Sequence, residues 1–185
     1  MSSIYVHVPF CKKRCTYCNF FSTTLLQRQE DYVNALTKEI ILRKGYITNP
    51  TTIYLGGGTP STLPASLLEK IFNSLDKNFN LSNIEEVTIE CNPDDLNKDY
   101  ISGLKNLPIN RLSMGIQTFN EEELKVLGRR HNSSNAIKAV ENVYNSGIEN
   151  ISIDLMYALP NQSLKTWESN LDIAAYSIIV TRVMT

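Results

Sequence analysis

The chain has 185 residues, 42% of them hydrophobic and 20% charged, with a formal net charge of −1 at pH 7. These values are ordinary for a globular protein, and the length suits a single sizeable core. A net charge this close to zero excludes the strongly basic surfaces that bind nucleic acids or anionic membranes, so we expect no nucleic-acid partner.

Short strand-like runs alternate with amphipathic helical ones along the chain. The expected strands cover residues 4–8, 52–55, 86–90, 111–117 and 150–156. Apolar residues at helical spacing lie between and after them, in the sets Tyr32/Leu36/Ile40, Leu68/Ile71/Leu75, Ile101/Leu104, Leu124/Leu127, Ile137/Val140/Tyr144 and Leu164/Trp167/Leu171. Strands that alternate with helices predict βα units and a parallel sheet.

Several of these helices carry end signals. Asn97 and Asn120 are expected N-cap residues of the third and fourth helices, and Pro64 stands at the expected first turn of the second. Gly147 follows the fifth helix as a natural stop.

The strands are polar on one face. In residues 86–90, Val87 and Ile89 share one face while Thr88 and Glu90 share the other, and residues 111–117 and 150–154 alternate in the same way. A parallel sheet with helices on both faces reads almost continuously apolar, so this pattern favours a barrel lined for a ligand. The alternative is that one side of the strands faces solvent. Glu90, Gln117 and Asp154 stand late in their strands, at the end where βα-barrel active sites form.

The cysteines point to a metal site. Three of the four lie within residues 11–18 and the other is Cys91, which makes a poor disulfide framework. The N-terminus lacks a signal peptide's basic segment and apolar core, and no apolar run is long enough to span a bilayer. We therefore expect a cytoplasmic, reducing environment, with Cys91 as a small buried residue.

Cys11, Cys15 and Cys18, with Tyr17 before the last, can occupy three corners of a four-iron cluster and leave the fourth iron open. The alternative is a zinc site, but structural zinc needs four ligands. The candidates for a fourth, which are His7, His131 and Cys91, do not have zinc-finger spacing. Lys12, Lys13 and Arg14 could offset the cluster's negative charge or be ordinary solvated loop charges.

A glycine run, Gly56-Gly57-Gly58, followed by Thr59 and Pro60, closes the second strand. It has neither the Gly-Lys-Ser/Thr ending of a phosphate-binding loop nor a dinucleotide fingerprint. Glycines let a ligand approach the backbone closely, although the run could equally be a tight turn.

Together these motifs resemble the radical S-adenosylmethionine (radical SAM) superfamily, and within it the oxygen-independent coproporphyrinogen oxidase-like family. The resemblance rests on residues 5–11 (YVHVPFC), 18–20 (CNF), 56–61 (GGGTPS), 90–93 (ECNP), 113–119 (SMGIQTF), 128–131 (GRRH) and 154–160 (DLMYALP). The porphyrinogen dehydrogenases of that family carry a further cysteine where this chain has Phe20. The difference favours the HemW branch, whose members are haem chaperones.

The resemblance implies the cofactors and their ligands. Cys11, Cys15 and Cys18 would hold a [4Fe-4S] cluster. S-adenosylmethionine (SAM) would contact Tyr5, Tyr17, Gly57, Gly58, Thr59, Glu90, Gln117, Arg129 and Asp154. Without the resemblance, Glu90 and Arg129 could form a structural ion pair. The implied partners are haem, a haem-accepting protein and an electron donor such as a flavodoxin. The haem-linked His-Asn-x-x-Tyr-Trp motif of the branch is not present at His131-Asn132.

The resemblance also implies the fold and its extent. We expect an α/β fold, a partial TIM-like barrel of about five βα units over residues 1–171, followed by a divergent tail over 172–185. The sixth strand and the rest of the family's C-terminal region are expected to be missing. Two other functions therefore stay open: oxidative decarboxylation of coproporphyrinogen III, and a truncated metal-binding remnant without activity.

Overall fold

The computed structural model describes residues 2–177, and its centre is a five-stranded parallel sheet. The strands follow chain order, β1-β2-β3-β4-β5, and all adjacent pairs are parallel. Their bounds are β1 Ser3–Val8, β2 Thr52–Gly57, β3 Glu86–Cys91, β4 Arg111–Gln117 and β5 Asn150–Leu155. All five predicted strands are confirmed, and β2 runs two residues further than expected, into the glycine run.

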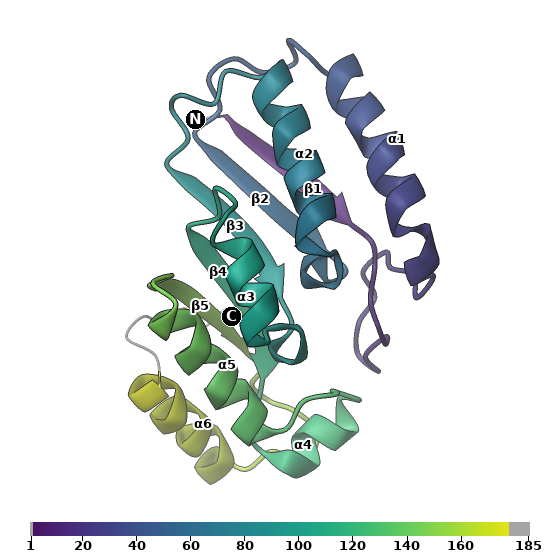
Figure 1. The fold of residues 1–185 in the computed structure, drawn as a ribbon. Helices are drawn as coiled ribbons and strands as arrows, with labels where there is room; N and C mark the ends of the chain where they lie inside the picture. Colours follow the sequence, from purple (N-terminus) through teal and green to yellow (C-terminus); the bar gives the residue numbers. More distant parts are fainter. Residues whose placement is uncertain (1, 178–185) are drawn as a thin grey trace.

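Helices follow the strands and pack beside one another (Figure 1). They are α1 Gln29–Leu42, α2 Ala65–Asn78, α3 Lys98–Leu104, α4 Glu121–Val126, α5 Ser133–Asn145 and α6 Leu164–Ser177. Packing contacts join α1 to α2, α2 to α3, α3 to α5 and α5 to α6. The predicted alternation of strands and helices, and with it the α/β class, is confirmed.

Three helices begin at an asparagine that caps their first turn, two of them as expected. Asn97 caps α3 by accepting from the backbone N–H of Tyr100, and Asn120 caps α4. Asn132 caps α5 in the same way, which was not predicted. Pro64 is not in the first turn of α2 as expected: its extended backbone makes it the N-cap residue.

The core lies between the helices and one face of the sheet. Ile53, Leu55, Ile89, Leu112 and Met114 are almost fully buried there. Helix residues fill the other side of this layer, among them Leu68, Ile71, Leu75, Leu104, Val140 and Val143. Burial of this continuous apolar layer is the main source of the stability of the fold.

The opposite face of the sheet is polar, as expected, and it is not simply exposed to solvent. Thr88, Ser113 and Ser152 on neighbouring strands are all buried. Arg111 covers them and donates to the hydroxyls of Thr88 and Ser152 at 3.1 and 2.9 Å. The inner face therefore combines a hydrogen-bonded polar layer with open space further along the strands.

The strand ends are shaped by short turns and one bulge. The 3₁₀ turns Pro60–Thr62 and Pro93–Asp95 follow β2 and β3. Near the end of β4 the register with β5 shifts between Gly115 and Gln117, and Gln117 has a positive φ of 74°. A bulge of this kind re-aims side chains beside functional sites.

Part of the expected divergent tail is helical. Helix α6 continues through residues 172–177, and residues 178–185 lie outside the described residues.

Among the described helices, none has both the length and the apolar character required to cross a membrane.

Candidate functional site

A pocket of about 340 Å³ lies at the carboxyl ends of the strands. Its lining comes from residues 11–22, here called the cysteine loop, from the glycine run and from the ends of β3, β4 and β5. Eleven of the twelve predicted site residues line it: Cys11, Cys15, Cys18, Tyr17, Gly57, Gly58, Thr59, Glu90, Gln117, Arg129 and Asp154. Residues from six separate segments, which span most of the sequence, thus meet around one cavity.

Three free thiols face this pocket from one loop. Cys11 is buried, Cys15 and Cys18 are half-buried, and none is in a disulfide. The Sγ of Cys15 accepts from Nη1 of Arg129 at 3.4 Å, and the Sγ of Cys11 lies 3.5 Å from Oγ1 of Thr59. Within residues 2–177, no three His, Cys, Asp or Glu side chains lie close enough together to hold a single metal ion. Three thiols on one loop, with a cation in contact, fit a multi-iron cluster, whose thiolate ligands bind different irons.

The glycine run is required by packing as well as by any ligand. The N–H of Gly58 donates to the carbonyl of Val8, and that of Thr59 donates to the carbonyl of Phe10. A Cβ on Gly58 would come within 2.8–3.0 Å of the backbone of Pro9 and Phe10. The run therefore lets the end of β2 lie directly against the start of the cysteine loop, which explains part of its composition without a ligand.

Glu90 is held in place by hydrogen bonds rather than by an ion pair. Its Oε1 accepts from the hydroxyl of Tyr54 at 2.7 Å, and its Oε2 accepts from the N–H of Gly57 at 3.1 Å. None of the described ion pairs joins Glu90 to Arg129. The structural ion pair between these two residues, which their charges allowed, is therefore absent from the described residues. Glu90 thus links the glycine run to β3.

Arg129 reaches the pocket with part of its guanidinium unpaired. Its Nη2 donates to the carbonyl of Gly115 and to Oδ1 of Asn92, and its Nη1 contacts Cys15. Its Nε is buried and has no hydrogen-bond partner in the described structure. Because the side chain also lines the pocket, its guanidinium is suited to receive an anionic group there.

Asp154 and Gln117 close the pocket on the side of β4 and β5. Burial, and then the nearby charge of Glu90, raise the pKa of Asp154 to about 6. No side chain or N–H group of the described residues donates a hydrogen bond to this carboxylate. A partly buried carboxylate without donors is suited to accept hydrogen bonds from a ligand's hydroxyl or amino groups.

This raised pKa predicts a stability cost at neutral pH. Between pH 3.8 and about 6 the folded chain binds the Asp154 proton more tightly than the unfolded chain does. The free energy of unfolding should therefore fall as pH rises through that window. In the ligand-free protein Asp154→Asn should remove this fall and add of order 1 kcal/mol at pH 7, after allowing for solvent screening.

Urea unfolding of both proteins at pH 4.5 and pH 7 measures this effect. A gain that is larger at pH 7 than at pH 4.5 is expected, and an equal gain at both values would contradict the assignment. Asp76→Asn is a suitable control, because Asp76 is exposed on α2 and its side chain has no hydrogen bond or ion pair among the described residues.

The two predicted tyrosines occupy different places. Tyr17 lines the pocket, and burial raises its pKa to about 12. Tyr5 does not line it: it is 57% exposed on β1, where it stacks on Tyr54 and its hydroxyl lies 3.1 Å from Nδ1 of His7. Tyr5 reaches the site only through Tyr54, which donates to Glu90, and its contact with SAM stays a prediction.

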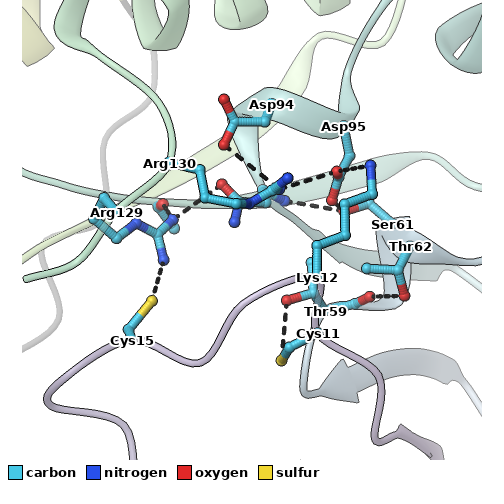
Figure 2. A network of polar contacts seen from close by, with 12 residues as sticks. Cys11, Lys12, Cys15, Thr59, Ser61, Thr62, Asp94, Asp95, Arg129 and Arg130 are labelled. Atoms are coloured by element: carbon cyan, nitrogen blue, oxygen red, sulfur yellow. Dashed lines mark hydrogen bonds and ion pairs between the residues drawn. The ribbon is translucent and has the colours of Figure 1, made fainter. Parts of the chain in front are cut away.

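Sequence reasoning missed a polar network behind the cysteine loop (Figure 2). Asp95 accepts from Lys12 at 2.7 Å, from Ser61 at 2.8 Å and from Arg130 at 3.2 Å. Ser61 accepts from the N–H of Asn92. The sequence feature that could have indicated this network is the position of Ser61 and Asp95, which are polar and lie a few residues beyond the ends of β2 and β3.

Two residues considered as ligands have structural contacts. His131 is buried, with Nε2 3.2 Å from the carbonyl of Ile116, and burial lowers its pKa to about 4. Cys91 is 4% exposed, as expected, and burial raises the pKa of its thiol. Neither belongs to a group of metal ligands in the described part of the chain.

Comparison with known proteins gives consistent matches. A family model for the radical SAM superfamily matches residues 5–174. The chain is 38% identical to the haem chaperone HemW of Lactococcus lactis, over 97% of this chain and 49% of that protein. It is 37% identical to HemW of Bacillus subtilis, over 97% and 51%. The chain therefore spans about half the length of the curated relatives it matches.

Solved structures show the same fold. Coproporphyrinogen III oxidase (HemN) of Escherichia coli, a radical SAM enzyme, superposes with a TM-score of 0.88 at 29% identity. The match covers 98% of this chain and 43% of that one. The five βα units are thus a partial TIM-like barrel of the radical SAM type, as predicted. Because the family model matches nearly the whole described chain, the protein belongs to the radical SAM superfamily.

Proposed function

We propose that this chain is the cluster- and SAM-binding part of a HemW-type haem chaperone. One observation carries the proposal: three free thiols, the glycine run and Arg129 line a single pocket at the carboxyl ends of parallel strands. The relatives named as HemW, at 37% and 38% identity, support this branch. We infer that Cys11, Cys15 and Cys18 hold a [4Fe-4S] cluster.

The remaining pocket residues suit SAM. When bound, a [4Fe-4S] cluster with one open iron supplies the electron for reductive cleavage of SAM. Arg129 would pair with a carboxylate, Asp154 and Gln117 would bind hydroxyl or amino groups, and Tyr17 would pack against a flat ring. The polar groups at Gly57, Gly58, Thr59 and Glu90 would complete the binding site. These groups would orient the ligand in the pocket.

A porphyrinogen dehydrogenase is the competing activity, because HemN superposes closely. Phe20 lies in the pocket lining, 70% exposed, where that activity is expected to need a further cysteine. The HemW assignment implies haem, a haem-accepting protein and an electron donor such as a flavodoxin as partners. We place the protein in the reducing cytoplasm, since its four cysteines are free.

Anaerobic reconstitution with iron and sulfide, followed by EPR of the reduced protein with and without SAM, tests the proposal. We expect a [4Fe-4S] signal that changes when SAM is added. Absence of the signal, or a spectrum indifferent to SAM, would refute cofactor binding. A haem titration and an anaerobic assay with coproporphyrinogen III then distinguish the branches. Haem binding is expected of a HemW-type protein, whereas formation of protoporphyrinogen would favour the dehydrogenase instead.

A further inference from the structure

We propose that Asp95 is a positioning residue that fixes the cysteine loop and Arg129 relative to each other. The inference rests on the proposed cluster site but concerns residues outside the pocket lining. Asp95 follows β3 in the turn Pro93–Asp95, and its carboxylate joins two loops that are far apart in sequence. Lys12 belongs to the first loop and Arg130 to the second.

The carboxylate of Asp95 is buried and fully engaged. The residue is 4% exposed, its Oδ1 accepts from Lys12 and Arg130, and its Oδ2 accepts from Ser61. A surface ion pair contributes little, but a buried carboxylate with three donors is different. Loss of its charge leaves Lys12 without its partner and leaves Arg130 with only Asp94, at 3.5 Å. This contact therefore constrains both loops strongly.

Each cation that Asp95 binds is adjacent to a pocket residue. Lys12 follows Cys11, and Arg130 follows Arg129. The chain of contacts continues from Ser61 to the N–H of Asn92, from the Asn92 side chain to Arg129, and from Arg129 to the Sγ of Cys15. Through these contacts Asp95 is linked to Arg129 and to the Sγ of Cys15 (Figure 2).

The rest of the cysteine loop has fewer hydrogen bonds and ion pairs to other parts of the chain. Thr16 binds the carbonyls of Val126 and Leu127 at the end of α4 through its hydroxyl and N–H. Lys13 and Arg14 have no described ion pair. Lys12 is therefore the charged anchor of this loop among the described residues, and its ammonium points to Asp95 instead of neutralising the thiolates.

The test uses Asp95→Asn, Lys12→Met and the double variant, with Glu86→Gln as a carboxylate control at the far end of β3, the strand that precedes the turn of Asp95. Brief trypsin digestion of the cluster-free proteins, followed by peptide mapping, measures cleavage after residues 12–14, which are Lys, Lys and Arg. Asp95→Asn and the wild type contain all three of these cleavage sites. We expect about tenfold faster cleavage there in Asp95→Asn, equivalent to ~1.4 kcal/mol of loop opening, with cleavage elsewhere unchanged. Glu86→Gln should cleave like the wild type.

A second measurement follows iron loss from the reconstituted proteins to a chelator. Both single variants should lose iron several-fold faster than the wild type, and the double variant no faster than Asp95→Asn, because Asp95 acts through Lys12. Fully additive effects, or iron loss at the wild-type rate, would overturn the inference. A wild-type protein that takes up no iron would instead refute the proposed function and leave the proteolysis result to decide the anchoring role.

Discussion

Replacing Cys15 by alanine should abolish assembly of the iron–sulfur cluster. Its Sγ lies in the pocket beside Arg129, and the nearest other cysteine on the loop, Cys18, would already be a ligand. The variant leaves only two of the three thiolate ligands. The iron content should therefore fall from about four per chain to background after desalting. Iron and sulfide analysis with the visible absorption spectrum measures the change.

Cys91→Ala is the matched control. Cys91 also borders the pocket, but its thiol is buried, lies 3.8 Å from the carbonyl of Ile89 and belongs to no group of metal ligands among the described residues. This variant should keep the full iron content with a modest loss of stability. If Cys91→Ala lost the cluster, or Cys15→Ala retained it, the ligand assignment would be wrong.

The sequence predicted the fold well because its signals were local and repeated. Alternation in residues 86–90 placed Val87 and Ile89 toward the helices and Glu90 toward the pocket, as the structure has them. Helix spacing and Asn caps marked the segments between strands. Parallel strands that follow one another then bring their carboxyl ends together, which is why eleven residues chosen from sequence meet at one pocket.

Partners of the site residues were harder to predict, because long-range contacts choose among them. Glu90 and Arg129 were a plausible ion pair by charge, yet Glu90 binds Tyr54 and Gly57 instead. Lys12 could be read as a solvated charge, whereas its partner Asp95 is more than eighty residues away in the chain. The positive φ of Gln117 arises from a register shift between two strands, which single-strand patterns do not report.

Replacing Arg129 by glutamine should weaken SAM binding by about 30-fold, or ~2 kcal/mol. The guanidinium has a buried Nε without a partner, and two of its contacts, to Gly115 and Asn92, hold it at the pocket wall. Truncating one partner of a half-buried charge pair costs at least this much. Equilibrium binding of SAM to reconstituted protein, compared at equal iron content, measures the loss.

Lys13→Gln separates a specific pairing from general attraction. Lys13 lines the same pocket and carries the same charge, but no described ion pair holds it in place. If Arg129 pairs directly with the ligand's carboxylate, Lys13→Gln should change affinity by less than about threefold, because an exposed charge is screened. Arg129→Lys should fall between wild type and Arg129→Gln, since it keeps the charge and loses the planar fork. Equal losses in Lys13→Gln and Arg129→Gln would show that the pocket attracts SAM by net charge alone.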